Sequence, residues 1–360
     1  MAKVIRPIVG AAAKTGKKIY ATISGVHRKV KKIYTVVNGQ NKLAWGGGSF
    51  GFIAGGNTRL DYNASGRARF LSSTNGTSWV VRDLGKYTDQ YFTVYASAYG
   101  NGITVIVGQY TYYTTDGVTF TEITSLANAQ LRSICYGNGR FVAVSYTDTY
   151  YSLDGINWTK STYSISSRPV DVCYDYVLNR FVCICLQPPG TTDSSGAYFI
   201  VSTDGGVTWL SGSHYSSYIP SPSKLVFDGT YFYATGSGRL ARFTMDANRR
   251  LVNLTIIGSG AFVWHTQGET FVTGYTSGST LCKRILADGT LEDFGTGLTI
   301  SGETRQIIKA DGAYYIIEYG TNGSIFRRPV GSSSWTKIYT FPGNDNNYFQ
   351  MTTICYCGEE

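Results

Sequence analysis

Short apolar runs that end at glycine, aspartate or asparagine turns recur along most of the chain. In residues 131–161 these runs cover 131–136, 140–146, 149–153 and 157–161. Short runs rich in Val, Ile and Tyr between turn residues predict β-strands, and the segment lacks the 3.6-residue period of an amphipathic helix. It therefore predicts a four-stranded antiparallel sheet.

The same pattern repeats about every forty residues. One four-stranded sheet per repeat is typical of a propeller blade. We therefore predict an all-β fold with a single seven-bladed β-propeller over residues 46–360, and a six-bladed ring with an irregular insertion is the alternative. The last residue of the repeated turn marks the seven units at Trp79, Phe120, Trp158, Trp209, Leu251, Phe294 and Trp335.

The two ends of the propeller segment match each other. Residues 350–358, "QMTTICYCG", resemble residues 130–137, "QLRSICYG", which form the first strand of a repeat and nothing more. The first unit, which begins at Gly46, lacks this strand. We expect the C-terminal strand to complete the N-terminal blade and close the ring, because closure removes free sheet edges.

The turn between the third and fourth strands of a blade has the pattern Ser/Thr-x-Asp-Gly-x-x-Trp/Phe. The glycine allows the turn conformation, the aspartate accepts hydrogen bonds from turn amides, and the aromatic residue packs between sheets. This pattern resembles the Asp-box of sialidase-like propellers, which implies a structural role only. The residues concerned are Asn75, Gly76, Trp79, Asp116, Gly117, Phe120, Asp154, Gly155, Trp158, Asp204, Gly205 and Trp209.

Catalytic patterns are weak in the sequence. A sialidase would bring three arginines, a Tyr and Glu pair and an Arg-Ile-Pro motif, and none of these can be matched by position. The three histidines form no recognisable pair of base and nucleophile. We therefore predict no enzymatic activity, no cofactor and no metal; a glycan-cleaving, sialidase-like propeller enzyme is the alternative.

Long loops rich in Tyr, Ser and Asn share the face opposite the tight turns. Tyr gives a rigid amphipathic contact surface, as in binding loops on other scaffolds. We predict a ligand-binding face there, and packing of the loops on their neighbours is the alternative for each residue. The candidate residues are Tyr62, Tyr87, Tyr91, Tyr163, Tyr215, Tyr218 and Tyr348.

Positive charge is concentrated at the N-terminus. Residues 1–45 contain ten Lys or Arg and no acid, whereas the other residues contain 22 basic and 23 acidic side chains. Two similar strings, "KKIYATISGVHRK" and "KKIYTVVNGQNKL", predict small β-hairpins. A disordered solubilising tail is the alternative, and the alternating strands argue against a nucleic-acid-binding arm.

This basic segment resembles the N-terminal parts of tail, baseplate and fibre-like proteins of bacteriophages. The resemblance implies a virion structural protein, assembled in the bacterial cytoplasm, in which residues 1–45 dock to other virion proteins. The propeller would then serve for adhesion to a host-surface glycan, with several copies per particle. A purely architectural decoration protein, for the capsid or the tail, is a further alternative.

The seven cysteines indicate reducing conditions rather than a disulfide framework. Their number is odd, and three of them, at 135, 173 and 355, occupy one position of the repeat. A buried small apolar role suits that position. No run of residues is long and apolar enough to span a bilayer, so we expect no membrane insertion.

Overall fold

The computed structural model divides the chain into two units, Met1–Gly48 and Ser49–Glu360. In the first unit it describes residues 20–23, 26–29, 32–37 and 40–46. In the second unit it describes residues 51–60, 66–88, 91–162, 168–186, 196–212, 218–276, 279–300, 302–320, 322–342 and 347–357.

The first unit contains two antiparallel hairpins. Strand β1 (Tyr20–Ile23) pairs with β2 (Val26–Lys29), and β3 (Lys32–Val37) pairs with β4 (Gln40–Gly46). The hairpins predicted from the repeated basic strings are therefore confirmed.

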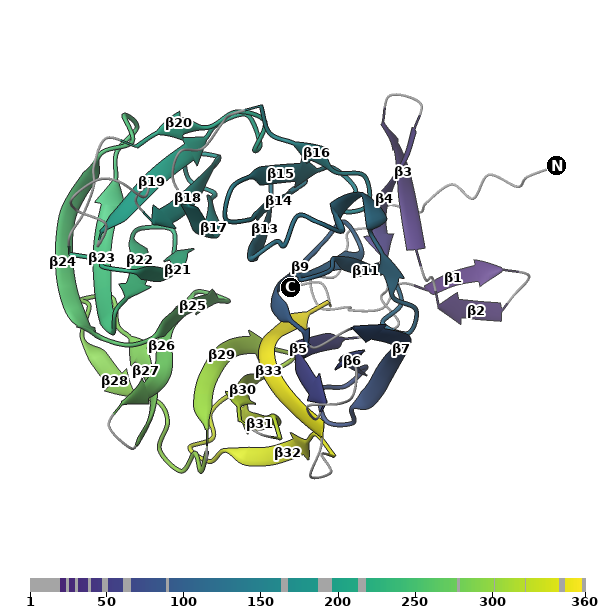
Figure 1. The fold of residues 1–360 in the computed structure, drawn as a ribbon. Helices are drawn as coiled ribbons and strands as arrows, with labels where there is room; N and C mark the ends of the chain where they lie inside the picture. The colour runs from purple at the N-terminus through teal and green to yellow at the C-terminus, as the bar shows by residue number, and fades with distance from the viewer. Residues whose placement is uncertain are drawn as a thin grey trace. The chain divides into compact units, whose positions relative to one another are not determined.

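The second unit is a ring of seven antiparallel sheets, one for each predicted repeat (Figure 1). Six of the sheets contain four strands in chain order, with the first strand innermost. From the inside outward, blade 2 has β9 (Val94–Gly100), β10 (Ile103–Gly108), β11 (Tyr112–Thr114) and β12 (Thr121–Glu122), and blade 3 has β13 (Ser133–Gly137), β14 (Arg140–Val144), β15 (Thr149–Ser152) and β16 (Thr159–Lys160). In the same order, blade 4 has β17 (Arg168–Asp175), β18 (Arg180–Leu186), β19 (Ala197–Ser202) and β20 (Leu210–Ser211), and blade 5 has β21 (Pro222–Phe227), β22 (Phe232–Gly236), β23 (Arg239–Met245) and β24 (Leu251–Ser259). Blade 6 has β25 (Phe262–Thr266), β26 (Glu269–Thr276), β27 (Ser279–Ile285) and β28 (Leu291–Asp293), and blade 7 has β29 (Glu303–Ala310), β30 (Ala313–Tyr319), β31 (Ser324–Pro329) and β32 (Thr336–Thr340).

Blade 1 combines the two ends of the propeller unit. Its innermost strand is the C-terminal β33 (Asn347–Tyr356), which pairs antiparallel with β5 (Phe52–Leu60). Strands β6 (Gly66–Ser73) and β7 (Val80–Thr88) follow outward, and the short β8 (Tyr91–Phe92) also pairs with β5. Figure 1 shows β33 in yellow beside the purple β5. Seven blades and closure by the C-terminal strand are thus confirmed.

The hydrophobic core lies between neighbouring blades. One cluster combines Val142 and Val144 of blade 3 with Phe181 and Cys183 of blade 4, and Trp209 from the outer turn of blade 4 joins it. Each fully buried large apolar side chain contributes about 1.5–3 kcal/mol relative to an exposed one. The strands therefore alternate their side chains between two inter-blade cores.

The antiparallel order separates the connections into two ends. Connections between blades, and between the second and third strands of a blade, lie where the innermost strands begin. The tight turns lie at the opposite end, where the innermost strands finish. Among the described residues the only helix is a short 3₁₀ turn at Thr124–Leu126, and no helix there is long and apolar enough to cross a membrane.

Candidate functional site

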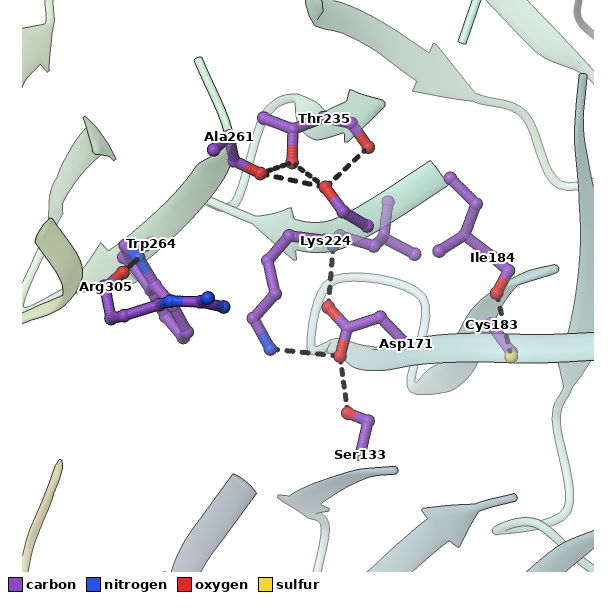
Figure 2. A network of polar contacts seen from close by, with 11 residues as sticks. Ser133, Asp171, Cys183, Ile184, Lys224, Thr235, Ala261, Trp264 and Arg305 are labelled. Carbon is purple, nitrogen blue, oxygen red and sulfur yellow. Dashed lines mark hydrogen bonds and ion pairs between the residues drawn. The ribbon is translucent and has the colours of Figure 1, made fainter. Parts of the chain in front are cut away.

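A polar network crosses the innermost strands of blades 3 to 7 near their first residues. Ser133 of β13, Asp171 of β17 and Lys224 of β21 occupy one repeat position, four residues before the turn that ends the innermost strand. The repeat therefore stacks a hydroxyl, a carboxylate and an ammonium group on three neighbouring blades (Figure 2).

The carboxylate of Asp171 is the centre of this network. It accepts hydrogen bonds from the Ser133 hydroxyl, from Lys224 Nζ at 3.1 Å and from the backbone N–H of Leu225 at 2.7 Å. The Asp171 side chain is 3% exposed and that of Lys224 is 18% exposed. A buried ion pair of this kind is stable only when its remaining hydrogen bonds are made. The three donors meet that condition for Asp171.

Aromatic rings hold the cations of the site. The Lys224 ammonium lies 4.6 Å from the centroid of the Trp264 ring in β25. The indole N–H of Trp264 donates to the backbone carbonyl of Arg305 in β29 at 2.7 Å. The Arg305 guanidinium lies 4.7 Å from the Phe262 ring and 4.1 Å from the Tyr319 ring. A cation over an aromatic face gains an electrostatic attraction, so these contacts position the Lys224 ammonium and the Arg305 guanidinium.

One further carboxylate and one further cation lie at the same strand ends. Glu303 Oε2 is 2.9 Å from Arg305 Nε, and both side chains are about a quarter exposed. The Arg132 guanidinium, just before β13, lies 3.5 Å from the Tyr146 ring and 4.7 Å from the Tyr95 ring. Together with Lys224 and the exposed Arg168 that begins β17, the strand ends therefore carry four basic side chains. Figure 2 shows Lys224 and Arg305 directed into the same region between the innermost strands.

This arrangement suits a ligand or a reacting group with negative charge. Lys224 uses one of its three N–H donors on Asp171, and partly desolvated cations bind anions more strongly than cations in water do. No group of three His, Cys, Asp or Glu among the described residues could hold a metal ion. Burial raises the pKa of the Cys183 thiol well above its ordinary value, so this cysteine is a packing group rather than a nucleophile.

The predicted tyrosine face is described only in part. Tyr62, Tyr163 and Tyr215 lie outside the described residues. Tyr91 of β8 and Tyr348 of β33 both pair with Arg59 of β5, and Tyr87 of β7 pairs with Arg67. Tyr218 is exposed in the connection that leads into β21 of blade 5. The structure thus brings three of the tyrosines into blade 1, and their role in binding stays a prediction.

The repeated turns have closely similar hydrogen bonds. In blade 3, Asp154 Oδ1 accepts from the amides of Ile156 and Asn157 at 2.9 and 2.8 Å, and the Ser152 hydroxyl accepts from the amide of Gly155 at 2.9 Å. Asn75 and Asp116 accept the corresponding bonds in blades 1 and 2. Asp204 accepts from Thr208 across the longer turn of blade 4. Membership of the Asp-box family stays a prediction.

Glycine and aromatic residues complete these turns. Gly76, Gly117, Gly155 and Gly205 have positive φ angles. The Trp79 and Trp158 indoles donate to the carbonyls of Gly76 and Gly155. Phe120 lies 4.8 Å from the Phe70 ring, and Trp209 is fully buried. These turns lie at the tight-turn end, away from Lys224 and Arg305.

Sequence reasoning did not identify the residues of the polar network. Asp171, Lys224, Trp264 and Arg305 come from four repeats and form no local motif. A signal was present nonetheless, because aligning the innermost strands by their turns places a charge where blades 3 and 1 have Ser133 and Thr353. A charged residue at a position that two other blades fill with a small hydroxyl side chain indicates a special role.

Comparison with known proteins places the chain by its fold alone. No family model matches the sequence, and no curated protein matches it. A protein from Lactobacillus plantarum shares 14% identity over 85% of this chain and 99% of its own, with a TM-score of 0.57. A putative 6-phosphogluconolactonase from Bacteroides uniformis shares 9% identity over 85% and 99%, with a TM-score of 0.55. The periplasmic gluconolactonase of Pseudomonas aeruginosa shares 11% identity over 84% and 98%, with a TM-score of 0.51.

These comparisons correct the function predicted from the sequence. Two of these three similar structures carry a functional name, and both are named as lactonases. The prediction of a bacteriophage adhesion protein without enzymatic activity is therefore wrong. A basic leader and Tyr-rich loops are compatible with many functions, and the propeller fold hosts binding proteins and enzymes alike. Neither feature therefore separates an adhesion protein from an enzyme.

Proposed function

We propose that the protein is a carbohydrate-active enzyme that hydrolyses the lactone of a sugar acid where the innermost strands β17 to β29 begin. The observation that carries this proposal is the pair of cations, Lys224 over the Trp264 ring and Arg305 over the Tyr319 ring, which are directed into one region between the innermost strands (Figure 2). The names of the similar propellers support the choice of lactone chemistry.

Lactone hydrolysis develops negative charge twice. Water adds to the carbonyl carbon, and the C=O electron pair moves to the oxygen to give a tetrahedral oxyanion. The ring C–O bond then breaks, the leaving ring oxygen takes up the proton that the base removed from the water, and the new carboxylic acid loses its proton to solvent, which gives a carboxylate and a hydroxyl group. The Lys224 ammonium supplies the donor that stabilises the oxyanion, and Arg305 binds the product carboxylate. One preorganised donor of this kind contributes about a hundredfold to a thousandfold in rate.

Glu303 is the carboxylate available to accept a proton from the attacking water. Asp171 is less available, since its side chain is 3% exposed and already accepts from Ser133, Lys224 and Leu225. Glu303 is partly exposed and is held beside the site by Arg305. Its role is that of a general base, whereas Asp171 positions Lys224.

Glycoside cleavage suits the site less well. Most glycosidases need two carboxyl groups on opposite sides of the scissile bond, about 5–9.5 Å apart. One of the two carboxylates of this network, Asp171, is committed to three donors and cannot serve as an acid or a base. A reaction that requires cations and a single base is therefore the better match.

The test is the release of acid from glucono-1,5-lactone, followed in a pH-stat and corrected for spontaneous hydrolysis. We expect Lys224→Met and Glu303→Gln each to lower kcat/KM by about a hundredfold or more. Lys283→Met, a charge removal in the third strand of blade 6, should leave kcat/KM unchanged. Circular dichroism must show that each variant is folded.

Two results would contradict the proposal. One is a wild-type rate equal to the spontaneous rate for glucono-1,5-lactone and for its 6-phosphate. The other is full activity in the folded Glu303→Gln and Lys224→Met variants. Release of reducing sugar from a polysaccharide, without lactone hydrolysis, would favour glycoside cleavage instead.

A further inference from the structure

A small pocket of about 130 Å³ lies between blades 3 and 4 at the tight-turn end. It is at the opposite end of the blades from Lys224 and Arg305, so it is separate from the site described above. Its lining comes from three turns and comprises Gly137, Asn138, Arg140, Asn179, Phe181, Thr203, Asp204 and Gly205.

Arg140 in this pocket has an equivalent in the next blade, Arg180. Each arginine pairs across its hairpin with the last residue of the innermost strand, Gly137 in blade 3 and Asp175 in blade 4. Each also donates to backbone carbonyls of the following blade. Arg140 Nη1 donates to the carbonyls of Asp204 and Gly205 at 3.2 and 3.4 Å. Arg180 does the same toward blade 5 at 2.8 Å.

The two arginines differ in their carboxylate partner. Arg180 Nε donates to Asp175 Oδ2 at 2.8 Å, and both side chains are 2% exposed. The position equivalent to Asp175 in blade 3 is Gly137. A Cβ atom on Gly137 would overlap the Tyr174 ring, so no side chain fits there. No carboxylate among the described residues pairs with Arg140. Blade 3 therefore has the arginine equivalent to Arg180 but no carboxylate equivalent to Asp175.

The amide of Asn179 adds a second donor to the pocket. Asn179 Oδ1 accepts hydrogen bonds from Asn138 Nδ2 at 2.9 Å and from the Tyr174 hydroxyl at 2.5 Å. Its oxygen is thereby fixed, and the N–H groups of the same amide remain as donors. Both chemical groups that a carboxylate needs, a guanidinium and an N–H donor, thus line one cavity.

We propose that this pocket binds a small monocarboxylate, which takes the place that Asp175 occupies beside Arg180. The carboxylate oxygens accept from Arg140 and from the Asn179 amide. At about 30 Å³ for each water-sized volume, the cavity holds roughly four such volumes, which suits an acid of the size of acetate or lactate.

The neighbouring Asp204 sets the charge of this ligand. Its carboxylate accepts hydrogen bonds from the Thr208 and Ser202 side chains and the Thr208 amide, so it belongs to its own turn. Partial burial would raise its pKa, but these hydrogen bonds outweigh that effect and lower the pKa. It remains ionised at neutral pH and repels anions, and this repulsion grows with the charge of the ligand. Dicarboxylates and phosphate therefore bind less well than monocarboxylates.

The experiment titrates the full-length protein with sodium acetate and sodium lactate, followed by calorimetry and by the unfolding temperature. Sodium chloride at equal ionic strength, sodium malonate and sodium phosphate are the comparison ligands. We expect saturable acetate or lactate binding with Kd in the millimolar range, and a rise in unfolding temperature that chloride does not reproduce.

Two variants test the assigned donors. Arg140→Met removes the guanidinium, and Asn179→Asp keeps the accepting oxygen but replaces the N–H donors with a negative charge. Each should weaken acetate binding by about tenfold or more. Arg250→Met, in an exposed turn of blade 5, is the matched control and should bind acetate like the wild type.

Absence of saturable binding to the wild type overturns the proposal, and so does unchanged affinity in a folded Asn179→Asp variant. Equal affinity for malonate or phosphate overturns the restriction to one charge. The outcome is independent of the lactonase proposal, because Lys224→Met should retain acetate binding and Asn179→Asp should retain lactone hydrolysis.

Discussion

Replacing Asp175 with Asn tests how much the ion pair at the junction of blades 4 and 5 stabilises the ring. The carboxylate has two tasks. One oxygen accepts from the amides of Val177 and Leu178 at 3.1 and 3.0 Å, and the other accepts from Arg180 Nε at 2.8 Å. Asparagine has a single side-chain oxygen, so either the bonds from the Val177 and Leu178 amides or the bond from Arg180 must be lost.

The expected loss follows from burial. Asp175 and Arg180 are each 2% exposed, and Arg180 keeps only its two backbone carbonyl partners after the substitution. Removing one member of a buried pair leaves the other charge uncompensated, which costs about 3–5 kcal/mol. We expect Asp175→Asn to lower the free energy of unfolding by that amount.

The assay is equilibrium urea unfolding, followed by tryptophan fluorescence at neutral pH. Glu292→Gln is the control, because Glu292 also binds an arginine, Arg284, but its side chain is 47% exposed. A pair at the surface contributes at most about 1 kcal/mol. In a double-mutant cycle, Asp175→Asn combined with Arg180→Met should lose less stability than the sum of the single changes.

The reasoning is refuted if Asp175→Asn shifts the unfolding midpoint no more than Glu292→Gln does. It is also refuted if 1 M sodium chloride removes the effect of Asp175→Asn, because salt screens exposed pairs far more than buried ones.

Two other changes test ring closure and the repeated turns. Phe349 of β33 is fully buried and stacks on Phe341 with ring centroids 4.4 Å apart, so Phe349→Ala should lower the free energy of unfolding by about 3–5 kcal/mol in urea; a loss of less than about 1 kcal/mol would count against closure by this strand. Partial burial alone would raise the pKa of Asp154, but hydrogen bonds from Asn157, Ile156 and Ser152 outweigh it and lower the pKa. Because the folded pKa lies below the unfolded one, Asp154 stabilises the protein above about pH 4, and this contribution is lost as the pH falls through the folded value. The urea midpoint of Asp154→Asn should therefore fall less between pH 6 and pH 3 than that of the wild type, and identical acid dependence would argue against this origin.

The blades could be predicted because every repeat carries its own strand and turn signals. In blade 3 the predicted runs 140–146 and 149–153 correspond to β14 (Arg140–Val144) and β15 (Thr149–Ser152). The short outer strand β16 covers only Thr159–Lys160. Strand β16 pairs with β15 alone, so fewer of its residues are held in the sheet than the predicted run 157–161 contains.

The polar network could not be predicted because it depends on contacts between repeats. The acid nearest to Lys224 in sequence is Asp228, whereas its ion-pair partner Asp171 belongs to the preceding blade. The Tyr-rich loops were the stronger signal, since composition is visible in a sequence and spatial position is not. The pocket at Arg140 was missed for the same reason. Its signal is the glycine that replaces an aspartate at one repeat position.

The pairing of β33 with β5 has a consequence for synthesis on the ribosome. Strand β5 is translated before blades 2 to 7, whereas its innermost partner β33 is translated after them. At about 5–20 residues per second, the edge of β5 stays unpaired for some tens of seconds while blades 2 to 7 are made. A nascent chain with an open strand edge invites wrong pairing with other chains. The cell therefore has to protect blade 1 until β33 has been made, and yield on expression should depend on chaperones that bind nascent chains.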